Sequence, residues 1–154
     1  MRAAQVEEGT RIAAEAIARG AVGPYQLQAA IAAVHDRAQR PEDTDWTEIA
    51  GLYGLLERVA PNPMVTLNRA IAVSMVEGPA AGLELLEAVS GELGDNHRLN
   101  ATRAHMLERA GEADRAAAEY ALAAERTTSL PEQQYLTRQA ARLRQAGGGA
   151  PAGG

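Results

Sequence analysis

Apolar side chains recur three or four positions apart through most of this chain, and that spacing is typical of amphipathic helices. Capping residues and helix breakers separate the apolar segments. Pro24, Pro63 and Pro79 stand where a helix tolerates proline, in its first turn, and Asp45 begins an Asp-x-x-Glu capping pattern. The pattern predicts about eight helices, of which the first covers about residues 3–19.

The stretch 63–123 contains the same pattern twice, at a period of 34 residues. The matched pairs are Arg69 and Arg103, Ala70 and Ala104, Val73 and Leu107, Gly82 and Ala116, Leu86 and Tyr120, and Val89 and Ala123. This period is typical of tetratricopeptide (TPR) repeats, whose helix–turn–helix units stack to bury their apolar faces. We therefore predict an all-α fold, a TPR-like right-handed superhelix of antiparallel helix hairpins.

A single TPR-like helical domain is expected over residues 1–146, with a flexible Gly/Ala/Pro tail at 147–154. The hairpins are predicted at about 24–60, 63–90 and 96–126, followed by a capping helix at 130–146. The first of these hairpins is a weaker copy, because its connecting loop is a few residues longer and breaks the strict period.

The composition narrows the classes of function. All 15 cationic residues are arginine, and the net charge of −5 argues against a phosphate-binding surface, so we expect no direct nucleic-acid binding. The absence of cysteine excludes disulfides and thiolate zinc sites. Neither a signal peptide nor an apolar stretch of bilayer-spanning length is evident, so we expect a cytoplasmic protein without membrane contact.

Candidate catalytic groups are scattered along the chain. The histidines lack close ligand spacing, at His35, His97 and His105, and the acidic residues at 42–45 are interpreted as a loop and a helix cap. The chain has no glycine-rich phosphate loop and no serine in a nucleophile-elbow context. We expect no enzyme activity, no metal and no cofactor.

Arg69 and Arg103 occupy equivalent positions in the two copies, where an apolar residue would be usual. Each guanidinium could pair with a carboxylate on an adjacent helix while its stem packs on apolar surface. The two arginines could instead bind an acidic partner. Both interpretations stay open, and the structural one is preferred.

Several motifs together resemble one family over about residues 7–145. They are Gly23-Pro24-Tyr25-Gln26-Leu27-Gln28-Ala29-Ala30-Ile31-Ala32-Ala33-Val34-His35, Thr44-Asp45-Trp46, Leu52-Tyr53 through Leu56, Val65-Thr66-Leu67-Asn68-Arg69-Ala70, Gly78-Pro79-Ala80-Ala81-Gly82-Leu83 and Arg103-Ala104-His105-Met106-Leu107-Glu108-Arg109. The chain resembles the C-terminal TPR-like extension of extracytoplasmic-function (ECF) RNA polymerase sigma factors. The two DNA- and polymerase-binding domains of that family are absent from this sequence.

The resemblance implies a regulatory domain that modulates transcription initiation by contacting the sigma core domains, RNA polymerase or another regulator. TPR domains usually bind partners on the concave face formed by the first helix of each hairpin. The corresponding partner-binding candidates are Met64, Leu67, Ile71, Arg98, His105, Glu108 and Arg109, together with Arg69 and Arg103. The alternative is that the apolar members are ordinary core and the charged members a solvated face.

Two other functions stay open. The chain could be a free-standing TPR-type adaptor for a peptide or protein unrelated to transcription. It could also be a small helical enzyme or ligand-binding domain, which would need convergent polar groups around a cavity.

Overall fold

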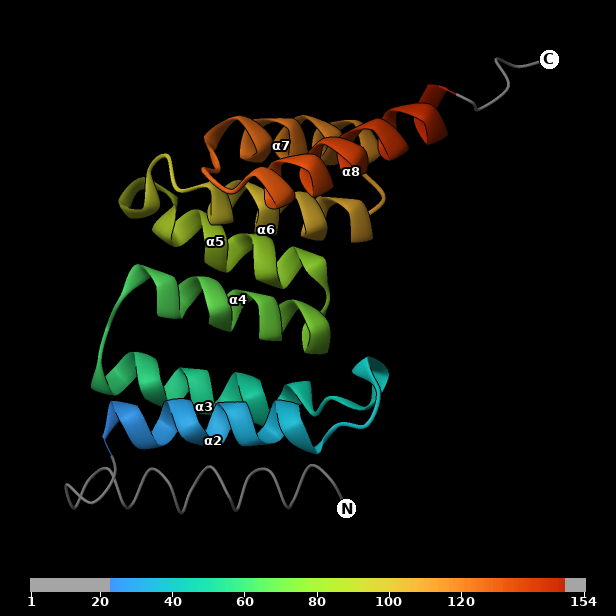
Figure 1. The fold of residues 1–154 in the computed structure, drawn as a ribbon. Helices are drawn as coiled ribbons and strands as arrows, with labels where there is room; N and C mark the ends of the chain where they lie inside the picture. Colours follow the sequence, from blue (N-terminus) through green and yellow to red (C-terminus); the bar gives the residue numbers. More distant parts are fainter. Residues whose placement is uncertain (1–22, 149–154) are drawn as a thin grey trace. The chain divides into compact units, whose positions relative to one another are not determined.

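The computed structural model describes residues 23–148, and this part of the chain folds into α-helices without a β-strand (Figure 1). The predicted all-α class is therefore confirmed. Seven α-helices lie within the described range. The helix predicted at about 3–19 and the tail residues 149–154 lie outside the described residues.

The chain consists of two compact units, and the boundary between them lies between Gly78 and Pro79. Within residues 23–78, the first unit contains the helices α2 (Pro24–Arg37), α3 (Trp46–Val59) and α4 (Pro63–Glu77), with a 3-10 turn, η1 (Pro41–Asp43), between α2 and α3. The helices of the second unit are α5 (Pro79–Leu93), α6 (His97–Arg109), α7 (Ala113–Arg126) and α8 (Leu130–Gly148). The hairpin predicted at 63–90 spans this division, and its pairing stays a prediction.

Side-chain caps begin several helices where the sequence suggests them. The Asp45 carboxylate accepts a hydrogen bond from the Glu48 amide at 3.1 Å, and the side-chain oxygens of Asn62 and Asn96 accept from amides two residues later at 2.8 and 2.9 Å. Each cap satisfies an amide that has no partner inside the helix. Gly78 ends α4 with φ at 102°, a conformation that side chains with a Cβ rarely adopt.

Two boundaries differ from the expectation. The loop expected at the start of the acidic stretch 42–45 is part of the 3-10 turn η1, whose Pro41 pre-sets the backbone dihedral of its first residue. The last helix runs to Gly148, two residues beyond the predicted end at 146.

Aliphatic side chains from three helices form the core of the first unit. Its buried members are Leu27, Ile31 and Val34 of α2, Ile49, Leu52, Leu55 and Leu56 of α3, and Ala72 of α4. At the edge of this core the rings of His35 and Trp46 meet edge to face, with centroids 5.5 Å apart. Burial of this apolar face holds α2, α3 and α4 together.

Small side chains dominate the core of the second unit. Its buried members are Ala104 and Leu107 of α6, Ala116, Ala117, Tyr120, Ala123 and Ala124 of α7, and Leu136, Ala140 and Leu143 of α8. Alanines at these contacts let the helices approach closely. The core therefore depends on close backbone packing, and the Tyr120 ring is its largest side chain.

Candidate functional site

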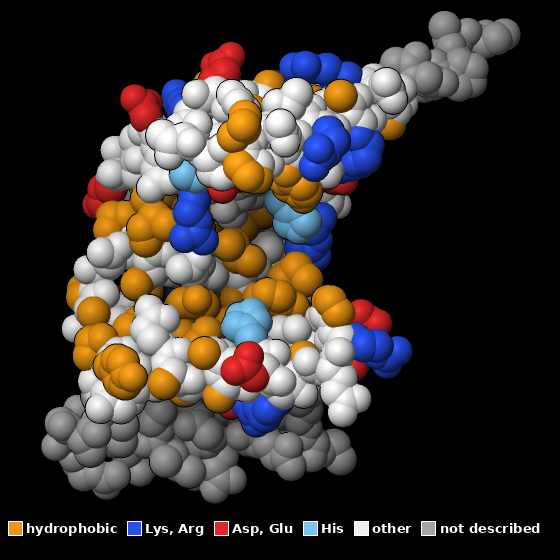
Figure 2. All heavy atoms as spheres, in the orientation of Figure 1, with side chains coloured by type: hydrophobic (Ala, Val, Ile, Leu, Met, Phe, Trp, Pro, Cys, Tyr) orange, Lys and Arg blue, Asp and Glu red, His pale blue; other side chains and the backbone are white. Residues whose placement is uncertain are grey.

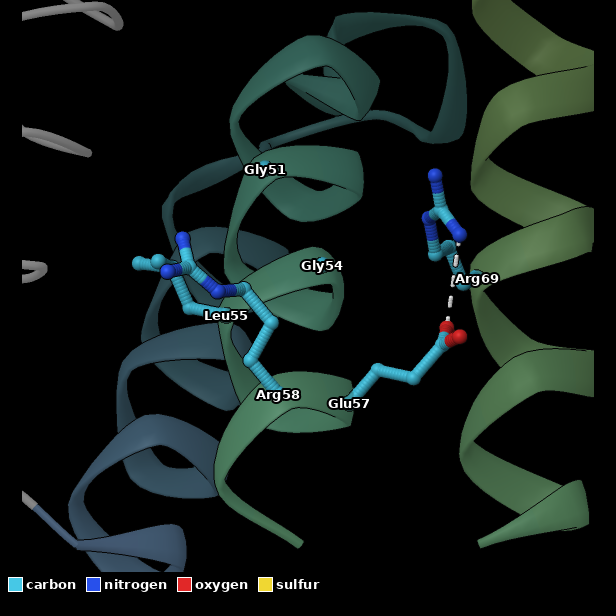
Figure 3. A pocket seen from close by; sticks show the side chains of 6 residues that line it. All are labelled: Gly51, Gly54, Leu55, Glu57, Arg58 and Arg69. Atoms are coloured by element: carbon cyan, nitrogen blue, oxygen red, sulfur yellow. Dashed lines mark hydrogen bonds and ion pairs between the residues drawn. The ribbon is translucent and has the colours of Figure 1, made fainter. Parts of the chain in front are cut away.

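Arg69 links α4 to α3 in the first unit. Its Nη1 lies 3.4 Å from Oε2 of Glu57, and the two side chains are 35% and 30% exposed. In Figure 3 the two side chains point toward each other across the space between the helices. The contact matches the structural interpretation of Arg69, in which its guanidinium pairs with a carboxylate on an adjacent helix.

A hollow of about 410 Å³ lies beside this ion pair. Its lining includes Gly51 and Gly54 of α3, which place no side chain in the space, and Arg58, which points away from Arg69 (Figure 3). Ligand sites usually enclose most of a ligand and converge several polar groups on it. Here one guanidinium is already neutralised by Glu57, so the hollow has the character of a surface depression beside a structural contact.

Arg103 makes the corresponding link in the second unit, with more partners. Its Nε and Nη2 lie 3.1 and 3.0 Å from Oε1 of Glu87 on α5, and its Nη1 lies 3.5 Å from Oε2 of Glu119 on α7. The Arg103 side chain is only 17% exposed. One guanidinium therefore ties together three helices, and its partial burial strengthens both ion pairs relative to a fully solvated contact.

A buried amide extends this link. Asn100 is 2% exposed, and its Nδ2 donates to Oε2 of Glu119 at 2.9 Å. Its Oδ1 accepts from Nη1 of Arg126 at 2.9 Å, and Arg126 also lies 3.4 Å from the Asp95 carboxylate. We call this set the Asn100 network; its members are Glu87, Asp95, Asn100, Arg103, Glu119 and Arg126. Because both ends of the Asn100 amide are paired, the network specifies how α6 and α7 face each other.

A second polar contact joins α6, α7 and α8. The Tyr120 hydroxyl donates to Oε1 of Glu108 at 3.1 Å, and Arg142 Nη2 donates to Oε2 of the same carboxylate at 2.8 Å. Burial raises the pKa of the Tyr120 hydroxyl well above its usual range, and the negative charge of Glu108 raises it further. The Glu108 carboxylate therefore accepts hydrogen bonds from side chains of two other helices, α7 and α8.

The predicted partner-binding residues fall into three environments. Leu67 is fully buried and belongs to the core, and Met64 and Ile71 are half-buried. Arg98, His105 and Arg109 are exposed on α6. Glu108, Arg69 and Arg103 take part in the contacts between helices described above. Their role in partner binding stays a prediction.

Sequence reasoning missed the Asn100 network and the Glu108–Tyr120–Arg142 contact. One signal was present: Asn100 stands at helical spacing from Ala104 and Leu107, on the apolar side of α6, where an amide needs buried partners. Nothing in the spacing identified those partners, which come from other helices.

The described residues contain neither a metal-binding cluster nor a bilayer-crossing helix. Among residues 23–148, no group of three or more His, Asp or Glu side chains could hold a metal ion. None of the helices in the described range combines the length and apolar composition that crossing a bilayer requires.

Comparison with known proteins gives a relative of unassigned function. No protein-family model matches the chain, and no solved structure matches it. An uncharacterized protein of Rhizobium meliloti (strain 1021) is 46% identical over 117 residues, which cover 76% of this chain. The match corresponds to 28% of that relative's length. The chain is therefore similar to a minor part of a longer bacterial protein.

Proposed function

We propose that this chain is the TPR-like regulatory domain of an ECF sigma factor, a protein-interaction domain that modulates transcription initiation. Its partners would be the sigma core domains, RNA polymerase or a regulator. The proposal rests on the motifs that resemble the C-terminal extension of these sigma factors over about residues 7–145. It implies a cytoplasmic location, where RNA polymerase acts.

One observation supports the repeat architecture behind this proposal. Arg69 is the seventh residue of α4 and Arg103 is the seventh residue of α6, and each pairs with a glutamate of the preceding helix. Residues related by the 34-residue period therefore make the same kind of contact. Stacked helical repeats of this sort usually serve as binding scaffolds.

The arrangement of charges favours a scaffold over an enzyme. Glu57, Glu87, Glu108 and Glu119 each pair with an arginine on another helix. A catalytic acid or base would be expected beside a cavity where several polar groups converge on a substrate. The ionised groups named here are engaged in holding helices together.

Capture by the immobilised chain tests the proposal. Purified ECF sigma core domains and core RNA polymerase are applied separately at about 0.15 M salt, where weak surface electrostatics are screened. We expect at least one of them to be retained and to be released by excess free chain. An unrelated helical domain of similar net charge serves as the control.

The outcomes separate the candidate functions. Retention of neither sigma domains nor polymerase would contradict the proposed role in transcription. If the chain instead retained a peptide or protein unrelated to transcription, the free-standing adaptor would be the better description.

A further inference from the structure

We propose that the second unit binds an acidic protein segment along a cationic strip on α6 and α8. The strip consists of Arg98, His105 and Arg109 on α6 and Tyr135, Arg138 and Arg142 on α8. The inference rests on the proposed function as a protein-interaction domain. It extends the partner-binding candidates of α6 to a continuous surface with α8, and it adds the chemistry of the partner.

Helical spacing puts the α6 members of the strip on one face. Arg98 and His105 are seven positions apart and Arg109 follows four positions later, so all three lie within a narrow sector of the helix. All three are exposed, whereas Leu99 and Met106, directly after Arg98 and His105, are buried. The outward sector of α6 therefore carries a guanidinium group near each end of the helix and an imidazole between them.

The α8 members of the strip also lie together on one face of their helix. Tyr135, Arg138 and Arg142 are spaced by three and four positions and share one face of α8, while Leu136, Ala140 and Leu143 turn into the core. Tyr135 is 49% exposed, and the Arg142 side chain is 48% exposed. The strip on α8 thus offers an aromatic ring beside two guanidinium groups.

Contacts near both ends hold these two faces side by side. Near the start of each helix, His97 Nε2 lies 2.9 Å from Oε1 of Glu132, and near the end of α6, Glu108 Oε2 lies 2.8 Å from Arg142 Nη2. The two helices therefore run in the same direction, and the strip continues from one to the other. Figure 2 shows arginine and histidine side chains gathered over α6 and α8 on the face in view.

The chemistry of the strip selects an acidic protein segment. Guanidinium groups bind carboxylates in a fork geometry, and a partly exposed tyrosine ring gives an apolar side chain a surface to pack on. Within the strip, Arg142 already pairs with Glu108, and Glu132 is engaged by His97. The exposed side chains of Arg98, Arg109 and Arg138 therefore supply the remaining guanidinium groups. A nucleic acid fits less well, because the whole chain carries a net charge of −5 and would repel a long phosphate backbone.

Fluorescence anisotropy with a defined probe tests this inference on the full chain. The probe is a labelled, acetylated peptide of three Glu-Leu-Glu-Glu units, compared with the same peptide carrying Gln for every Glu. The test variant is the double reversal Arg109→Glu with Arg138→Glu. The matched control is Arg115→Glu with Arg144→Glu, which makes the same charge change at exposed arginines outside the strip.

We expect the acidic peptide to bind, the Gln peptide to bind at least about tenfold more weakly, and higher salt to weaken binding. The double reversal in the strip should weaken binding about tenfold or more, and the control reversal should change it less than about twofold. Circular dichroism checks that both variants keep their helical content.

Three results would overturn the strip as an acidic-segment site: no binding of the acidic peptide, equal losses in the two double variants, or preferential binding of a DNA duplex. Failure of the strip and failure of the proposed function are distinguishable. If one of these three results is obtained while the unmodified chain captures the sigma domains or polymerase, the strip is wrong and the function stands. If the unmodified chain captures neither the sigma domains nor polymerase, the proposed function is wrong, whether or not the acidic peptide binds.

Discussion

Arg126 on α7 donates a hydrogen bond from Nη1 to Oδ1 of Asn100 on α6, across 2.9 Å and 26 positions of sequence. The Asn100 amide lies in the interior, and its other end donates to Glu119. A buried amide with both ends paired contributes to stability chiefly through the penalty of leaving any of its partners unpaired. The contact therefore helps to fix the facing sides of two helices whose shared core consists largely of alanine.

Replacing Asn100 with leucine tests this role. The isosteric apolar side chain leaves Glu119 and Arg126 without their amide partner, and we expect a loss on the order of 1–3 kcal/mol in the free energy of unfolding. Urea denaturation followed by circular dichroism measures the loss. Thr137→Ala, at an exposed position of α8, is the control and should change stability by less than about 0.5 kcal/mol. An unchanged urea midpoint for Asn100→Leu would show that the network adds nothing.

The two matched arginines should differ in their contribution to stability. Arg103 is 17% exposed and pairs with two glutamates, whereas Arg69 is 35% exposed and pairs with one. We expect Arg103→Ala to cost about 1–3 kcal/mol and Arg69→Ala less than about 1 kcal/mol, because exposed ion pairs contribute little. Thermal and urea unfolding of the two single variants compare them directly. The reverse order would contradict the burial argument.

Tyr120 makes stability depend on pH in the alkaline range. Its pKa in the folded chain lies above the value of about 10 expected in the unfolded chain, so the folded state keeps a proton that the unfolded state loses. The stabilising effect is complete below about pH 10 and declines as the pH rises above that value.

The pH dependence can be isolated with Tyr120→Phe. Urea midpoints measured from about pH 8 to about pH 11 should fall with pH in the unmodified chain and fall less in the variant. Tyr25→Phe is the matched control, because the Tyr25 side chain is 82% exposed. Parallel curves for the unmodified chain and Tyr120→Phe would show that another group is responsible.

Leu86 tests how much a buried side chain of α5 contributes to stability. It is fully buried on α5, and its truncation to alanine should cost on the order of 2–5 kcal/mol through lost burial and the cavity left behind. Leu130→Ala removes the same atoms from a side chain that is 63% exposed and should have a much smaller effect. Differential scanning calorimetry measures the melting temperatures of both variants. Equal melting temperatures for the two variants would place Leu86 outside the core.

Helix positions were predictable because the signals that set them are local. Asp45, Asn62 and Asn96 cap helices through amides only two or three residues away, and a proline stands at the start of α2 and α4. The 34-residue period likewise shows in the sequence that Arg69 and Arg103 are equivalent. The sequence alone therefore determined the all-α class, most helix boundaries and the pair of arginines that makes matching contacts.

Only the tertiary structure decided what those arginines bind. Arg69 pairs with a glutamate 12 positions before it, and Arg103 with glutamates 16 positions before and after it. These separations do not follow the repeat period, because a contact between helices depends on how each helix is rotated about its axis and how closely the pair packs. The same holds for the partners of Asn100 and for the alignment of α8 with α6. Local pattern sets the helices, and packing selects the side chains that meet between them.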